Sequence, residues 1–247
     1  MEGKTVVTLN LHKFSGLVHK WLGLLIGIQV VLWVVGGLVM SWFELERVRG
    51  EHNIREVEAA PIDPAAGLKP VAEIIAAASE PVASVALKRL GGRLVYDLTG
   101  AADDQHSLVD ALSGELLSPL PAETALALAV ADFAGTSSPS RPEFIEAHNL
   151  EYRGALPVWR VVMNDEEGTR LYVSPATGRV LARRNAVWRI YDFFWMLHIM
   201  DYENRTDFNN PLLVFFSITA ILFSLTGIVL IFYRFKRRDF AWLRGKS

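Results

Sequence analysis

The side chains that could hold a cofactor are limited, because the chain has six histidines, five methionines and no cysteine. Without cysteine there is no disulfide, cysteine nucleophile, thiolate zinc or iron–sulfur site, and no covalent haem attachment through a C-x-x-C-H motif. A cofactor must therefore be held by histidine, methionine, tyrosine or carboxylate groups. His12 and His19 precede one strongly apolar run and His198 precedes another. His12 shares a helical face with His19, because the two are seven residues apart.

Other combinations of reactive residues are weaker. The run Asp103-Asp-Gln-His106 has the residue types of a metal site but falls in a predicted loop, where acidic side chains are usually solvated. His148 and Glu146 lack the i, i+4 histidine pair of a helical zinc protease. The chain has no G-x-S-x-G elbow, phosphate-binding loop or dinucleotide fingerprint, so NADPH or flavin would have to be bound by another protein.

Two uncharged apolar runs, residues 22–43 and 211–233, each reach the roughly 20 residues that a helix needs to cross a bilayer. Hydrophobic residues make up 51% of the chain, which is more than a wholly soluble protein is expected to carry. The first run is too long for a secretory signal core, and no small-x-small cleavage site follows it. We therefore predict a membrane protein with two transmembrane helices that contact the lipid bilayer.

Charge is segregated along the chain, although the net charge is only −2. Three lysines and one acidic residue precede the first apolar run, six basic residues and one acidic residue follow the second, and residues 44–210 hold 16 basic and 25 acidic residues. By the positive-inside rule, both termini are expected in the cytoplasm and the middle segment outside. We expect no nucleic-acid partner. Five arginines in the middle segment are expected to pair with its carboxylates or to contact lipid headgroups: Arg153, Arg160, Arg183, Arg184 and Arg189.

The middle segment is predicted to be a small α+β unit used twice. Alanine-rich stretches predict helices, and alternating or β-branched stretches bounded by glycine and proline predict strands. The expected helices are residues 71–79 and 123–133, and the expected strands are residues 82–90, 93–98, 107–111, 115–117, 144–153, 158–163, 170–174 and 179–182.

An internal repeat supports this duplication. Residues 108–117 align with residues 172–181 at an offset of 64, and the alignment places Gly114 over Gly178. A glycine at that position would supply the positive φ that a short hairpin loop requires.

Aromatic residues crowd residues 186–202, which include His198. This density beside a predicted span is typical of a helix in the headgroup layer or just below it. The predicted organisation is a lead-in (1–21), a first transmembrane helix (22–43), a periplasmic double domain (44–184, with units of about 60–120 and 121–184), an interfacial aromatic helix (185–203), a second transmembrane helix (211–233) and a basic cytoplasmic tail (234–247).

Small residues in both spans allow close helix packing. Gly23-x-x-x-Gly27 and Gly36-Gly37 lie in the first span, and Ala220-x-x-x-Ser224 lies in the second. They could pack the two spans of one chain together, or they could join the chain to a second copy or to a partner membrane subunit.

Both external units resemble the PepSY domain. The resemblance is carried by residues 170–178 (Arg-Leu-Tyr-Val-Ser-Pro-Ala-Thr-Gly) and by residues 109–114 (Val-Asp-Ala-Leu-Ser-Gly). The flanks resemble the PepSY-associated transmembrane family, through His19-Lys-Trp-Leu-Gly23 at the start of the first span and Trp195-Met-Leu-His198 before the second. This implies a bacterial inner-membrane protein. Related proteins include ferrisiderophore reductases that hold b-type haem between histidine-bearing helices, whereas soluble PepSY domains occur in protease propeptides.

The resemblance implies that His19, His198 and, less directly, His12 are candidate ligands of haem b, which needs two axial imidazoles. A full span should separate the depths of His19 and His198 by roughly 30 Å. The two cannot then bind the same haem in one chain. A homodimer would instead form a His19 pair near one face and a His198 pair near the other, and a partner subunit could equally supply the missing ligands. Relatives usually have four spans, which two copies of this chain would provide.

We therefore expect a membrane-anchored accessory or electron-transfer component linked to iron or siderophore reduction. The alternative is a non-enzymatic envelope module that regulates a peptidase or scaffolds a membrane complex.

Overall fold

The computed structural model describes residues 11–56, 60–63, 67–102 and 105–234, and it divides into two compact units. One unit combines residues 1–42 with residues 192–247, and the other comprises residues 43–191. We describe each unit by itself as the helical unit and the lobe.

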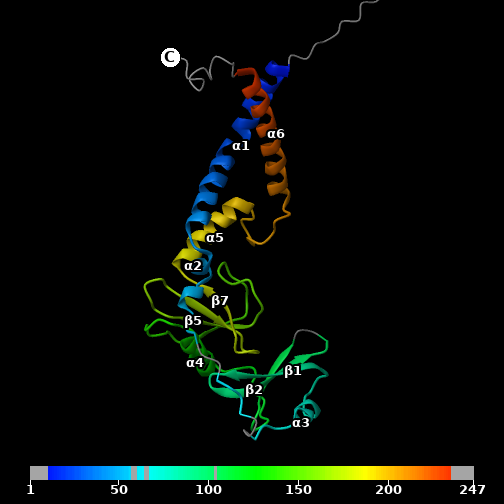
Figure 1. The fold of residues 1–247 in the computed structure, drawn as a ribbon, viewed down its shortest axis with the longest axis vertical. Coiled ribbons are helices and arrows are strands. Elements are labelled where there is room, and N and C mark those ends of the chain that lie inside the picture. Colours follow the sequence, from blue (N-terminus) through cyan, green and yellow to red (C-terminus); the bar gives the residue numbers. More distant parts are fainter. Residues whose placement is uncertain (1–10, 57–59, 64–66, 103–104, 235–247) are drawn as a thin grey trace, which may run out of the picture. The chain divides into compact units, whose positions relative to one another are not determined.

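The helical unit is built on the two apolar helices, α1 (Leu11–Trp42) and α6 (Pro211–Arg234). Both are long and apolar enough to cross a membrane. They pack antiparallel, because the His12 ring lies against the Tyr233 ring and Gly23 faces Phe223. Figure 1 shows them side by side where α1 begins and α6 ends, and diverging toward their other ends. The helices expected at residues 22–43 and 211–233 are thus present, and the first extends eleven residues further toward the N-terminus.

The aromatic segment forms α5 (Ala186–Ile199), whose last eight residues belong to the helical unit. The final carbonyl groups of a helix lack intrahelical partners and need other donors. Here Gln29 donates to the carbonyl oxygen of Leu197 at 3.2 Å, Trp33 to that of His198 at 2.8 Å, and Asn210 to that of Ile199 at 2.8 Å. Side chains from α1 and from the residue before α6 therefore hold the end of α5.

The lobe contains two antiparallel sheets. Two short helical segments, α2 (Leu45–Arg49) and η1 (Glu51–Asn53), open it, and α3 (Val71–Ala76) precedes the first sheet. The first sheet has the order β1-β2-β3, with β1 (Val82–Leu90), β2 (Arg93–Gly100) and β3 (His106–Asp110). After α4 (Ala122–Asp132), the second sheet has the order β4-β5-β6-β7, with β4 (Glu143–Ile145), β5 (Val158–Val162), β6 (Arg170–Val173) and β7 (Val180–Arg184).

The two sheets share one apolar core around α4. Leu108 comes from the first sheet, Ala125 and Ala129 from α4, and Val161 and Leu171 from the second sheet, and all are buried in the same cluster. Each unit also has a smaller cluster of its own, around Tyr96 in the first and around Tyr172 in the second, so the cluster at α4 joins the two units.

The predicted repeat is visible in atomic detail at the two hairpin turns. In the first, Gly114 donates to the Asp110 carbonyl oxygen at 2.9 Å and has φ 76°. In the second, Gly178 donates to the Ser174 carbonyl oxygen at 2.9 Å and has φ 68°. The positive φ expected at both glycines is confirmed.

Some element boundaries were wrong. The strand expected over residues 144–153 ends at Ile145, because the Asn149 side chain accepts hydrogen bonds from the backbone N–H groups of Glu151 and Tyr152 and turns the chain. Residues 115–117 make only an isolated bridge at Leu116, and α3 ends at Ala76 rather than at residue 79.

Candidate functional site

The histidine nearest the middle of the helix pair is His19, which lies on α1 against α6. Its Nδ1 atom is 3.0 Å from the carbonyl oxygen of Phe223 and 3.1 Å from the hydroxyl oxygen of Thr226. The ring is stacked on the Phe223 ring, with centroids 4.1 Å apart and planes 11° from parallel. Three independent contacts thus fix the position and plane of this imidazole.

These contacts also determine which ring nitrogen of His19 carries the proton. The Phe223 carbonyl oxygen can only accept a hydrogen bond, and Thr226 donates its own hydroxyl proton to the same oxygen at 2.8 Å. The contact with Phe223 therefore favours Nδ1 as the donor, because a lone pair on Nδ1 would face the carbonyl oxygen. In the neutral ring, the lone pair is then on Nε2, which has no hydrogen-bond partner among the described residues. This is the arrangement in which a histidine is oriented to bind a metal.

The register of α1 against α6 determines the level of His19 along the helix pair. His19 faces Gly227, which is seven residues before the end of α6, or about 10 Å along the helix axis. The helical register pairs the polar start of α1 with the apolar end of α6, so the imidazole lies well within the apolar length of α6. An ionisable side chain at such a depth is a candidate functional group by default.

His198 is placed differently. Trp33 donates to its backbone carbonyl, and Trp33 is 14 residues after His19, so the two histidines are separated by about 21 Å along α1 rather than the roughly 30 Å expected. Its Nδ1 atom is buried and has no hydrogen-bond partner among the described residues. A buried unpaired N–H is costly, which favours the neutral ring with its proton on Nε2. That form carries its lone pair on the buried Nδ1 atom, so the ring would have to turn this atom outward or move its proton before it could ligate a metal.

His12 is exposed and packs edge-on against Tyr233, with ring centroids 5.4 Å apart. It lies two helical turns from His19, on the same side of α1. The structure therefore brings His12 and His19 to one seam between α1 and α6, and it places His198 on a separate level.

The remaining histidines have partners within the lobe. His106 is 3.0 Å from the Asp97 carboxylate, which also pairs with Lys88 at 2.6 Å. Burial favours a higher pKa for Asp97, but hydrogen bonds from Lys88 and His106 and their charges hold the pKa below its ordinary value. His148 bonds to the Gly154 carbonyl oxygen at 3.0 Å. Over the described part of the chain, no three ligand-type side chains converge on a metal position, and residues 103 and 104 lie outside that part.

Most of the five arginines selected from the sequence form ion pairs with carboxylates. Arg183 makes a two-pronged pair with Asp132, and Arg189 bonds to Glu151 at 2.9 Å. Arg160 pairs with Glu143. Arg153 and Arg184 donate to the backbone carbonyl oxygens of Leu150 and Glu151. The expected pairing with carboxylates is confirmed for Arg160, Arg183 and Arg189.

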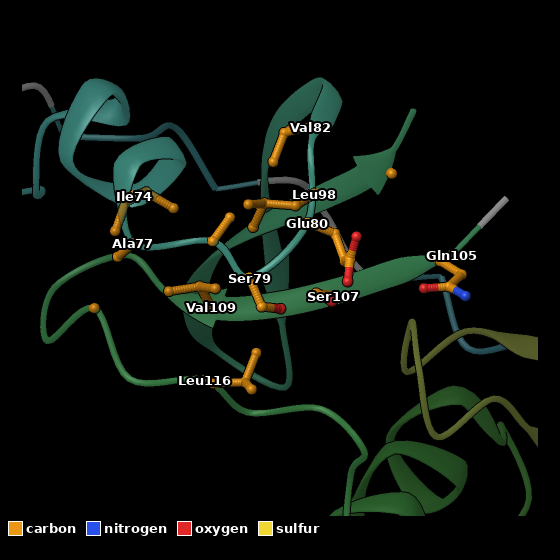
Figure 2. A pocket seen from close by; sticks show the side chains of 13 residues that line it. Ile74, Ala77, Ser79, Glu80, Val82, Leu98, Gln105, Ser107, Val109 and Leu116 are labelled. Carbon is orange, nitrogen blue, oxygen red and sulfur yellow. The ribbon is translucent and has the colours of Figure 1, made fainter. Parts of the chain in front are cut away.

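A cavity of about 260 Å³ lies between α3 and the first sheet (Figure 2), and no sequence pattern predicted it. Its floor is aliphatic and includes Ile74, Leu98 and Val109. Among the described residues of its lining, Glu80 is the one with a charged side chain, and no cation in that part of the chain pairs with its carboxylate. The cavity suits an aliphatic group that carries a positive charge nearby.

Comparison with known proteins adds one finding. The family model described as the PepSY-associated TM region matches residues 16–247, which include all but the first five residues of α1, the whole lobe and α6. No curated protein matches the chain, and no solved structure does.

Proposed function

The chain belongs to the family of the PepSY-associated TM region, and from that premise we propose that this membrane protein is an electron-transfer component that binds b-type haem through His19. The observation that carries the proposal is the set of contacts that orients the His19 ring and leaves its Nε2 atom without a partner. Its Nδ1–H is committed to the Phe223 carbonyl oxygen, its plane is fixed by stacking, and its Nε2 lone pair is unused by the described residues. Bound haem would supply reversible one-electron chemistry.

A second histidine to hold the same haem would have to come from another chain. His12 is seven residues from His19 on the same helix, or about 10 Å, and His198 is about 21 Å away along α1. Neither can lie opposite His19 across one iron. A second copy would supply an identical His19, and two copies together would give four spanning helices.

Small residues on α1 support a second copy. Gly23 and Gly36 contact Phe223 and Phe194 of the same chain, whereas the positions that a Cβ would take at Gly27 and Gly37 have no atom within 4 Å. Open backbone of this kind allows another helix to approach closely. A partner membrane subunit remains the alternative source of the ligand.

An absorption spectrum of the detergent-extracted protein tests the proposal. We expect a Soret band and a reducible α-band, and we expect His19→Ala to abolish the bands of the His19 site, while the control His148→Ala in the lobe leaves them unchanged. One haem per two chains would indicate the His19 pair alone, and one haem per chain would indicate a second pair at His198. A colourless protein, or a spectrum that survives His19→Ala, would show that the assignment is wrong.

The proposed acceptor class is ferric iron held by a siderophore, as the family resemblance implies. The proposed arrangement has both termini in the cytoplasm and the lobe in the periplasm of a bacterial inner membrane. Protease protection of a tag at Ser247 in spheroplasts would test this topology, because digestion of the tag from outside would reverse it.

The cavity in the lobe supports a second candidate, a non-enzymatic module that binds an envelope protein such as a peptidase. Its aliphatic floor and the Glu80 carboxylate suit a peptide with a basic residue beside an apolar one. We expect a labelled peptide of that pattern to bind the full chain and to lose affinity on Glu80→Lys, but not on Glu203→Lys. A colourless protein that binds such a peptide would favour this module over electron transfer.

A further inference from the structure

We propose that Gly227 is a positioning residue for His19, because the space left by its missing side chain lets the imidazole reach the carbonyl that fixes its protonation. This inference rests on the proposed function, since it concerns how the haem ligand is prepared. It assigns roles to Gly227 and Phe223, which lie on α6 and do not themselves touch a metal.

Gly227 is the glycine of the helix pair whose absent side chain faces the His19 ring directly. A Cβ at Gly227 would lie 3.0 Å from Cε1, 3.5 Å from Nδ1 and 3.9 Å from Nε2 of His19. At Gly27, by contrast, an added Cβ would meet no atom within 4 Å. An alanine at position 227 must therefore push the imidazole away from α6, whereas an alanine at position 27 has free space.

Displacement of the ring by a few tenths of an ångström would lengthen and weaken the contact that favours this tautomer. The Phe223 carbonyl oxygen accepts the Nδ1 proton at 3.0 Å, and in the opposite tautomer the same oxygen would face the Nδ1 lone pair. The Thr226 hydroxyl can serve either tautomer, because it can donate as well as accept. The carbonyl is therefore the deciding acceptor, and Gly227 is the residue that keeps the ring within its reach.

The hydrogen bond from Nδ1–H affects how strongly His19 would bind a metal, because it changes the electron density at Nε2. An Nδ1–H donated to an acceptor makes Nε2 a stronger base, and loss of such an outer hydrogen bond typically weakens metal affinity by about 10- to 100-fold. A ring that moves off the carbonyl should bind haem at least about tenfold more weakly. Haem iron bound to such a ring should also be easier to reduce, because the weaker Nε2 base stabilises the oxidised iron less.

Nitrogen-15 spectra of the full-length, haem-free chain in micelles, labelled at histidine, give a readout that does not depend on haem. We expect the His19 signals to show the Nδ1–H form in the wild type and in Gly27→Ala, and a shift toward the Nε2–H form in Gly227→Ala. His19→Ala would identify the signals. Wild-type signals in Gly227→Ala, or an equal shift in Gly27→Ala, would overturn the proposal.

Thr226→Val provides a test that does not need Gly227→Ala to fold. It removes the hydroxyl but leaves the carbonyl, so the Nδ1–H form should persist. A switch to the Nε2–H form in Thr226→Val would overturn the assignment of Phe223 as the deciding acceptor. If the tautomer behaves as expected and the wild type nevertheless fails to bind added haem, the positioning role stands and the proposed function fails.

Discussion

Alanine at the two repeat-related turn glycines should destabilise the protein to different extents. Gly114 and Gly178 occupy equivalent positions, with φ 76° and 68°, so each substitution forces a residue with a Cβ into the left-handed region. The surroundings differ. A Cβ at Gly114 would meet the flexible Lys69 side chain at 3.0 Å, whereas a Cβ at Gly178 would lie 2.6 Å from Leu90 Cδ1 and 3.1 Å from Leu120 Cδ1.

Two contributions determine the expected loss in the free energy of unfolding, the cost of a positive φ and the cost of overpacking. The left-handed conformation costs an L-residue about 1–2 kcal/mol, and this cost is common to both sites. Overpacking of a filled core adds about 1–3 kcal/mol, and only Gly178 faces such a core, since Leu120 belongs to the cluster around α4. We therefore expect a loss of about 1–2 kcal/mol for Gly114→Ala and about 2–5 kcal/mol for Gly178→Ala.

Chemical unfolding of the full chain in detergent, followed by near-ultraviolet circular dichroism, measures this difference as a shift in midpoint at unchanged slope. The gap between the two variants is more informative than either value alone, because the backbone cost cancels. Equal losses, or a larger loss for Gly114→Ala, would refute the reasoning that the second turn is packed into the shared core and the first is not.

Three further outcomes are expected. Arg183→Ala should lower the free energy of unfolding by about 1–3 kcal/mol, because it removes charged hydrogen bonds from the partly buried Asp132, and a double-mutant cycle with Asp132→Ala would measure the coupling. Burial favours a higher pKa for Glu151, but two arginines, Arg189 first, hold the pKa below its ordinary 4.5. The stabilisation from Glu151 should therefore be complete above about pH 5 and be lost as pH falls below 4.5, a dependence that acid unfolding would show to be weaker in Glu151→Gln. Asn210→Ala should cost about 1 kcal/mol and speed amide hydrogen exchange in the first turn of α6, because Asn210 caps that helix and bonds the last carbonyl of α5.

Sequence pattern predicted those elements whose signal is local. The Gly91-Gly92 turn and the alternating residues on either side of it predicted β1 at its observed bounds and β2 to within two residues. The apolar runs predicted α1 and α6, because an uncharged stretch of that length usually forms a helix that crosses the membrane. Asn149 shows where this reasoning fails, since residues 144–153 look extended in composition, and a single side chain that accepts two backbone hydrogen bonds ends the strand.

The site depends on information that no local pattern contains. Composition identified His19 as a candidate, but its depth is set by the register of α1 against α6, which pairs Gly16 with Leu230 and Gly23 with Phe223. A shift of one turn would move the imidazole off Gly227 and leave Nδ1 without the Phe223 carbonyl. The feature that favours ligation is therefore a contact between two residues that are 204 positions apart in the sequence.

The two histidines first considered as equivalent ligands are distinguished by what surrounds their Nδ1 atoms. At His19 the atom faces a carbonyl oxygen, and at His198 it is buried without a partner. In an apolar layer, an unpaired polar atom costs more than it does in water. A rearrangement that gave Nδ1 a partner would therefore stabilise the ring of His198, whereas the ring of His19 already has its partner. If a second haem binds there, its binding should be slower than at His19, because the ring must first rotate, and stopped-flow loading of His19→Ala against His198→Ala would resolve the two rates. Equal rates would mean that the Nδ1 environments do not govern ligation.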